Sequence, residues 1–426
     1  MRILRGLKRR ILQVPRVAKQ QLLYAKQQLL FALPLRDGVL FIGYAEGALG
    51  LGQSFRARLM AAEAADFAFA VYPFQVNIET RLIEPYMPHR YDKTHPYSIN
   101  VIEVAADQVP EVFRALAPQM LANSYNILCT YWELPEAPEE WRAYLAGIHE
   151  IWAPNRFVAT AFAKIFNGPI IVMPPAIDTG GSHPGRAHFG LDEERFYFMF
   201  SFDYHSSPFR KNPLGVLNAF ECAFPRGDEN VGLIIKSTGA HYPDIKNPID
   251  QAMARDRRVL LMDWNLPREE MLGLIQASDA YVSLHRAEGF GLGMAEAMTF
   301  GRMVIGTDYS GCTDFLTDKT GFPVPYQLRP LEPYEYPWSA GQLWAEPDHN
   351  AAVETMRRAV AHPAEGKKRG EAARDYVIQN YSTAAVGRAM RDRLDLLLTK
   401  RKSRIAKFRT TFAKAARSFA SEASSK

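Results

Sequence analysis

The alternation of short apolar segments with helix-length segments is the feature of this 426-residue chain that most restricts its fold. Each apolar segment has the length of a buried strand, and the stretches between them have room for helices. Such an alternation predicts βαβ units and a parallel sheet covered by helices. The expected strands are 38–43, 67–72, 99–104, 127–131, 150–152, 170–173, 197–202, 231–236, 259–262, 280–284 and 304–306.

A loop rich in Pro, Gly, His and Asp, residues 174–192, interrupts this alternation. The pattern therefore predicts an α/β protein of two doubly wound domains in tandem, facing each other across a cleft. Ligands of such domains bind at the carboxyl ends of the strands, so functional residues are expected directly after strands. The expected divisions are a basic amphipathic segment 1–36, domains 37–176 and 177–380, a return helix 381–398 and a basic tail 399–426.

Composition restricts the class of protein further. Hydrophobic residues make up 47% and charged residues 23% of the chain, which is typical of a globular protein and excludes a disordered or fibrous one. The three cysteines, Cys129, Cys222 and Cys312, are odd in number and form no CxxC pattern. We therefore expect no disulfide framework and no zinc site, and a reducing, cytoplasmic compartment.

Positive charge is confined to the two ends. Residues 1–36 carry +9 and residues 399–426 carry +8, which leaves −12 on the body of a chain whose formal net charge is +5. Leucines and isoleucines alternate with cations between residues 11 and 33, so this segment could lie on an anionic membrane, pack on its own domain or remain solvated. A nucleic-acid-binding protein would carry cations across its folded body, whereas this body is negative, so we do not expect the protein to bind nucleic acid. No apolar run is long enough to span a bilayer, and no cleavable signal is expected.

The most informative segment follows the strand 280–284. Glu288 and Glu296 stand eight residues apart, and glycines at 289, 291 and 293 lie between them at the start of an expected helix. Backbone N–H groups at such a helix start suit a diphosphate. A carboxylate in the first turns can accept both hydroxyls of a ribose, and a carboxylate in the loop can accept those of an attached sugar. The pair alone occurs by chance about one time in 16, but the strand, the glycines and the following G-x-x-V-I-G-T make the combination specific.

This segment resembles the E-x7-E signature of retaining glycosyltransferases of the GT-B fold, specifically glycosyltransferase family 4. Four other stretches agree with that family in order and spacing: 152–157 (W-A-P-N-R-F), 172–178 (V-M-P-P-A-I-D), 210–213 (R-K-N-P) and 310–315 (S-G-C-T-D-F). The resemblance covers about residues 38–398 and is strongest over 195–330. It implies two Rossmann-like domains facing a cleft.

The resemblance implies a role for each matching residue. Glu296 would bind the nucleotide ribose and Glu288 the donor hexose. The diphosphate would be held by Lys211 and by the backbone of Gly289, Phe290 and Gly291, with Gly50 and Gly52 forming the loop of the first domain that lies against donor and acceptor. The family's usual Arg several residues before Lys211 is missing, so the second phosphate cation would be Arg210, Lys236 or Arg286.

Three further features of the sequence are candidates for a functional role because of where they stand. Trp132 and Glu133 follow the strand 127–131 and would line the acceptor side, although Trp132 could equally belong to the core and Glu133 to the surface. His285 directly follows a strand beside Glu288 and is either functional or a satisfied core histidine. The glycines of 47–52 depart from G-x-G-x-x-G and lack an acid about 20 residues later, so a dinucleotide is not expected.

Together these features predict a retaining hexosyltransferase that uses a nucleotide diphosphate sugar as co-substrate, with neither metal nor cofactor. The expected acceptor is lipid-linked or a polysaccharide, in cell-surface glycan synthesis at the inner face of the membrane. Two alternatives stay open: a non-catalytic membrane-associated scaffold of the same fold, and a sugar-nucleotide epimerase. A scaffold would be expected to have lost Glu288, Glu296 or Lys211, and all three are present.

Overall fold

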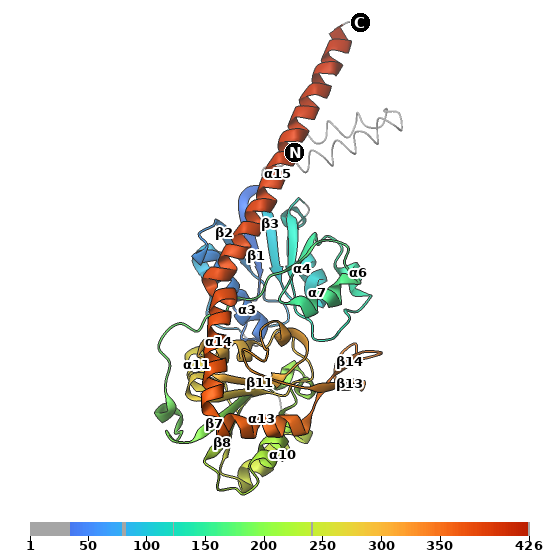
Figure 1. The fold of residues 1–426 in the computed structure, drawn as a ribbon. Coiled ribbons are helices and arrows are strands. Elements are labelled where there is room, and N and C mark those ends of the chain that lie inside the picture. Colours follow the sequence, from blue (N-terminus) through green and yellow to red (C-terminus); the bar gives the residue numbers. More distant parts are fainter. Residues whose placement is uncertain (1–34, 79–81, 122, 240–241, 425–426) are drawn as a thin grey trace.

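The computed structural model describes residues 35–78, 82–121, 123–239 and 242–424, and its core is two parallel six-stranded sheets (Figure 1). The first sheet has the strand order β2-β1-β3-β4-β5-β6. Its strands are β1 Arg36–Gly43, β2 Phe69–Pro73, β3 Tyr97–Glu103, β4 Tyr125–Cys129, β5 Glu150–Ala153 and β6 Ile170–Val172. Every strand pairing in this sheet is parallel, and all residues of β3 are buried, as expected of a strand covered on both faces.

The second sheet has the order β12-β11-β10-β7-β8-β9 and is also parallel throughout. Its strands are β7 Phe196–Asp203, β8 Val231–Thr238, β9 Val259–Met262, β10 Ala280–Ser283, β11 Met303–Thr307 and β12 Phe322–Val324. A separate antiparallel hairpin follows, formed by β13 Tyr326–Pro330 and β14 Leu343–Pro347. The predicted fold class, two doubly wound α/β domains, is therefore confirmed.

Helices cover the two sheets. Those of the first domain are α3 Gly50–Ala64, α4 Val109–Ala115, α5 Pro118–Leu121, α6 Trp141–Tyr144 and α7 Arg156–Ala163. Those of the second are α8 Pro208–Lys211, α9 Pro213–Ala223, α10 Pro243–Arg255, α11 Arg268–Ala277, α12 Leu292–Thr299, α13 His349–Ala361 and α14 Pro363–Tyr381. Short 3-10 turns are η2 Pro88–Arg90, η3 Ala106–Gln108, η4 Arg186–Phe189, η5 Tyr204–Ser206 and η6 Ser310–Asp314.

The chain crosses between the domains twice, and the two crossings are hydrogen-bonded to each other. The backbone N–H of Ile177, on the way to the second domain, donates to the carbonyl of Tyr381, on the way back, at 2.7 Å. The return is made by α15, which begins at Thr383 and continues as one helix to Ser424. The expected return helix and basic tail are thus a single element, and residue 398 marks no helix end.

Helix α15 packs along the first domain and then extends past it (Figure 1). At Gly387 an added Cβ would strike the Ala61 carbonyl of α3, so glycine permits the close approach of the two helices. Arg393 of α15 pairs with both oxygens of the buried Glu150 carboxylate, which anchors the helix to β5. The expected segment 1–36 lies, up to residue 34, outside the described residues.

Among the helices in the described parts of the chain, none has both the length and the hydropathy that are needed to cross a membrane.

Candidate active site between the two domains

A cavity of about 700 Å³ lies between the carboxyl ends of the two sheets. The first domain contributes Gly50, at the start of α3, and Tyr131 to Glu133, which follow β4. The second contributes the ends of β7, β8 and β10 together with the loop that leads into α12. This is the position at which doubly wound folds bind ligands.

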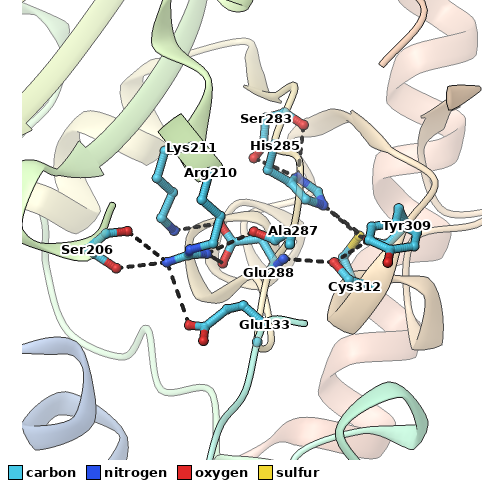
Figure 2. A network of polar contacts seen from close by, with 12 residues as sticks. Glu133, Ser206, Arg210, Lys211, Ser283, His285, Ala287, Glu288, Tyr309 and Cys312 are labelled. Carbon is cyan, nitrogen blue, oxygen red and sulfur yellow. Dashed lines mark hydrogen bonds and ion pairs between the residues drawn. The ribbon is translucent and has the colours of Figure 1, made fainter. Parts of the chain in front are cut away.

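Glu288 is the centre of a polar network at this cavity (Figure 2). One carboxylate oxygen is 2.5 Å from Nζ of Lys211, and the other is 3.1 Å from Nη1 of Arg210. Its backbone N–H donates to Oγ of Ser310 at 2.8 Å. Burial alone would raise the pKa of this carboxyl, but the charges of Lys211 and Arg210 outweigh it and lower the pKa to about 2. Glu288 is therefore ionised at neutral pH.

Arg210 connects the two domains at the cavity. Its side chain is only 3% exposed, and its guanidinium donates to the carbonyl of Ala287 at 2.9 Å and to Oγ of Ser206 at 2.8 Å. Glu133 of the first domain lies 3.7 Å away as an ion-pair partner. A buried guanidinium with several fixed acceptors is rigidly placed, and its fork geometry suits recognition of carboxylate or phosphate.

The backbone around Lys211 is held in an uncommon conformation. Helix α8 is a single turn between Ser207 and Asn212, whose φ angles are 54° and 55°. Asn212 tolerates the left-handed region, donates to the Leu284 carbonyl at 2.8 Å and caps the following helix at Gly215. The R-K-N-P motif is thereby explained: Pro213 begins α9, Asn212 supplies the turn, and Lys211 is held against Glu288.

The loop that follows Glu288 begins helix α12 and contacts the first domain. Gly291 has a φ of +93°, which favours glycine, and it caps the start of α12. The carbonyl of Gly289 accepts a 2.6 Å hydrogen bond from the amide of Asn155, at the start of α7 in the first domain. The loop that carries Glu288 is therefore attached to both domains.

The three candidates for the second phosphate cation differ in position. Arg210 and Lys236 line the cavity, and burial lowers the pKa of Lys236 to about 8 despite the opposing effects of Asp263 and Asp203. Arg286 is instead paired with Glu346 at 2.6 and 2.9 Å and is absent from the cavity wall.

Besides Arg286, three predicted site residues do not line the cavity as it stands. Glu296 is buried, and its carboxylate is 2.6 Å from Arg268 of α11. His285 is fully buried, with its ring nitrogens 3.0 Å from Oγ of Ser283 and 3.2 Å from the Tyr309 carbonyl, and burial lowers its pKa. These contacts correspond to the core-histidine alternative.

Gly52 is the third. An added Cβ there would strike the Gly47 carbonyl, so this glycine permits packing within the loop, whereas a Cβ at Gly50 would meet nothing within 4 Å. Only Gly50 of this pair therefore faces the cavity.

Trp132 and Glu133 lie on the part of the cavity wall that the first domain forms. Trp132 is both buried and part of the cavity wall, and its indole N–H donates to the Glu136 carbonyl at 2.8 Å. Glu133 is half-buried and accepts a 2.7 Å hydrogen bond from the hydroxyl of Tyr336. Trp132 is thus a core residue that also borders the cavity, and its role toward an acceptor stays a prediction.

Sequence reasoning missed several residues that contact this network or the cavity, among them Asn155, Ser206, Tyr336 and Trp338. Asn155 belongs to the W-A-P-N-R-F stretch, which resembles a family motif. The resemblance drew attention to this stretch but did not predict that Asn155 contacts the second domain. Tyr336 and Trp338 belong to the aromatic run 334–338, which was a usable signal. Among the described residues, no group of three His, Cys, Asp or Glu side chains is arranged to hold a metal ion.

Comparison with known proteins agrees with this architecture. Residues 194–376 match the family model described as Glycosyl transferases group 1. Among curated proteins, no sequence matches the chain significantly.

Similar solved structures include HepE from Anabaena in complex with UDP and glucose, with 15% identity, a TM-score of 0.59, and coverage of 84% of this chain and 99% of that one. Sucrose-phosphate synthase from Thermosynechococcus elongatus has 15% identity and a TM-score of 0.63, with 86% and 100% covered. A glycosyltransferase from Rickettsia africae has 16% identity and a TM-score of 0.59, with 85% and 99% covered.

The chain is thus a two-domain protein of the GT-B fold. Within its second domain, residues 194–376 are similar to the group 1 glycosyltransferases.

Proposed function

We propose that the protein is a retaining glycosyltransferase that moves a hexose from a nucleotide diphosphate sugar to a lipid-linked or polysaccharide acceptor in cell-surface glycan synthesis. The observation that carries the proposal is the pairing of Glu288 with Lys211 and Arg210 at the wall of the interdomain cavity. These groups are a carboxylate able to accept sugar hydroxyls and two cations able to hold phosphate. UDP is bound by the similar HepE structure, and UDP is therefore a suitable first donor nucleotide to test.

In the proposed reaction the bond between the hexose C1 and a phosphate oxygen breaks, and the acceptor oxygen bonds to C1 on the same face. Negative charge grows on the departing diphosphate, where Lys211, Arg210 and the amides of the 289–291 loop would stabilise it. The acceptor proton passes to the leaving phosphate. Glu288 is ionised and held by two cations, so it would orient the hexose through its hydroxyls and would not act as a general acid.

Ribose binding by Glu296 would require an exchange of partners. Its carboxylate is now paired with Arg268, whose side chain is 34% exposed and can turn toward solvent at low cost. Two ribose hydroxyls would then replace one guanidinium. Release of Arg268 by the nucleotide is thus part of the proposal.

A panel of UDP- and GDP-sugars, read by thermal shift of the full chain, tests the proposal. A ligand at 100 times its dissociation constant adds about 2.7 kcal/mol to the free energy of unfolding, so at least one nucleotide should raise Tm by several degrees. Lys211→Met should abolish that rise. If no nucleotide raises Tm, the proposed function is wrong. An epimerised nucleotide sugar formed without acceptor, detected by NMR, would favour the epimerase instead.

We further propose that the basic ends hold the enzyme on an anionic membrane surface. Helix α15 supports this, because it extends beyond the first domain and includes nearly all of the +8 segment (Figure 1). Each cation near such a surface contributes up to about 1 kcal/mol.

A further inference from the structure

The loop between β13 and β14, residues 331–342, contacts the first domain at the edge of the cavity. The Tyr336 hydroxyl donates to Glu133 at 2.7 Å, and the Trp338 indole N–H donates to Glu140 at 2.6 Å. Gln342 adds a 3.0 Å hydrogen bond to the Glu136 carbonyl. The loop therefore forms part of a wall that belongs to both domains.

This loop is held firmly by buried charge. Glu335 at its centre is buried and accepts from Arg329 at 2.6 and 2.8 Å. The same carboxylate accepts from the backbone N–H of Glu332 at 2.8 Å, and the Glu335 carbonyl accepts from Ser207 at 2.8 Å. Fixed partners on both sides keep the aromatic residues of the loop in place before any ligand binds.

Trp338 has a strained backbone conformation. Its φ is +54°, in the left-handed region, which is strained for a bulky residue. Its side chain nevertheless stays 40% exposed beside the cavity, with its ring centroid 5.0 Å from that of Trp141 and 6.0 Å from that of Trp132. Backbone strain that leaves an indole partly exposed does not serve the core, and such outliers cluster at ligand sites.

We propose that Trp338, Tyr336 and Trp132 form an acceptor subsite for a neutral pyranose ring, an inference that rests on the proposed function. The N–H and O–H groups of all three rings are engaged by Glu140, Glu133 and the Glu136 carbonyl, so the rings offer apolar surface to the cavity. A pyranose has an apolar C–H face that packs on aromatic rings, and hydroxyls at its rim that need acceptors.

The charge of this wall selects among acceptors. Glu133 and Glu140 would repel a phosphate or carboxylate held against the rings, whereas a sugar hydroxyl can donate to Glu133. Glu133 is also an ion-pair partner of Arg210, at 3.7 Å, so a hydroxyl bound there would lie next to the proposed donor site. The subsite is thus specific for an uncharged sugar and excludes glycerol phosphates and uronic acids.

Saturation-transfer NMR on the full chain tests the subsite with defined probes. The probes are the methyl α- and β-pyranosides of glucose, galactose and mannose, with glycerol 3-phosphate and methyl glucuronide as charged comparisons. Neutral pyranosides should bind and the charged probes should not. Trp338→Ala should weaken pyranoside binding at least 10-fold while UDP or GDP affinity changes less than 2-fold, and Trp338→Tyr should restore most of the binding.

Trp264→Ala is the matched control, because Trp264 is 55% exposed and does not line the cavity. It should leave pyranoside binding unchanged, and near-wild-type Tm in each variant establishes folding. Pyranoside binding that survives Trp338→Ala, preferred binding of the charged probes, or no pyranoside binding by the wild type would each overturn the subsite. Pyranoside binding without any nucleotide binding would reject the proposed donor and leave the subsite standing.

Discussion

Lys211, Arg210 and Glu288 form a site whose charges are mutually satisfied before a ligand arrives. Removing one partner from a buried ion pair is costly, because the remaining charge has neither water nor a counter-ion. The unliganded pocket is therefore stable with the Glu288 carboxylate at the cavity wall. A diphosphate would provide a second set of anions for the same two cations.

The two glutamates should fail in different ways when replaced. Glu288→Gln frees two cations, so nucleotide diphosphate binding should stay normal or tighten, while transfer falls about 10²-fold because hexose orientation is lost. Glu296→Ala should weaken nucleotide binding itself, since the ribose contact is lost with or without the sugar. Calorimetry with free UDP or GDP and initial-rate assays measure the two effects. Identical defects in both variants would contradict this division of roles.

The lowered pKa of Glu288 predicts how acid affects stability. A carboxyl whose pKa falls from 4.5 to about 2 on folding stabilises the protein fully above pH 4.5 and loses that effect as the pH falls toward 2. The difference in free energy of unfolding between wild type and Glu288→Gln should therefore shrink by up to ~3 kcal/mol across that range. Urea unfolding at stepped pH measures it, with Glu371→Gln as an exposed-carboxylate control. A pH-independent difference would show that Glu288 is not held ionised by its partners.

At the scale of elements, the strands that carry the site were predictable and the elements that complete it were not. All of the expected strands are present with ends shifted by a few residues, because continuous apolar runs reveal strands buried on both faces. The hairpin β13–β14 was missed because its strands, Y-Q-L-R-P and L-W-A-E-P, are short, polar and contain proline.

Which polar side chains pair with one another could not be predicted from the sequence either. The sequence motif brought Glu288 and Lys211 to the same cavity, but their pairing depends on a bend at Asn212 that only the three-dimensional structure reveals. His285 and Glu296 stand at informative positions in sequence, yet Ser283 and the Tyr309 carbonyl hold the ring of His285, and Arg268 pairs with the carboxylate of Glu296. Sequence position therefore predicts a neighbourhood, whereas the orientation of each side chain depends on what packs behind it.

The first turn of α3 offers a matched pair of substitutions. Gly52→Ala would place a Cβ against the Gly47 carbonyl, so it should lower the free energy of unfolding by about 1–3 kcal/mol. Gly50→Ala meets no atom within 4 Å and should leave stability equal or slightly higher, but it narrows the cavity and should raise the donor or acceptor KM. Thermal unfolding and steady-state kinetics separate the two. Equal stability losses would contradict the packing role assigned to Gly52.

At the scale of the whole molecule, negative charge belongs to the two-domain body and positive charge to the ends of the chain. The body carries −12, and α15 extends the C-terminal cations past the first domain (Figure 1). A negative body beside an anionic bilayer would be repelled, while its basic ends would be attracted. The second domain would then remain in solution, free to open and close on its donor.

Liposome sedimentation of the full chain tests this arrangement. Replacing Lys407, Arg409, Lys414 and Arg417 by Gln should weaken binding to vesicles containing anionic lipid by 10-fold or more, since several cations act together and salt screens them. The matched control replaces four exposed cations of the body, Lys319, Lys367, Lys368 and Arg374, by Gln, and should weaken binding by less than about 2-fold. Binding that is indifferent to salt, or equal in both variants, would reject attachment through the helix.

The proposed function requires a nucleotide diphosphate to occupy the cavity between the two domains. A crystal structure of the complex with UDP or GDP, whichever raises Tm, tests it directly. The diphosphate should lie within hydrogen-bonding distance of Lys211 Nζ and of the amides of the 289–291 loop, with the ribose hydroxyls on Glu296 and Arg268 displaced. A nucleotide bound outside this cavity, or one whose phosphates lie away from Lys211, would contradict it.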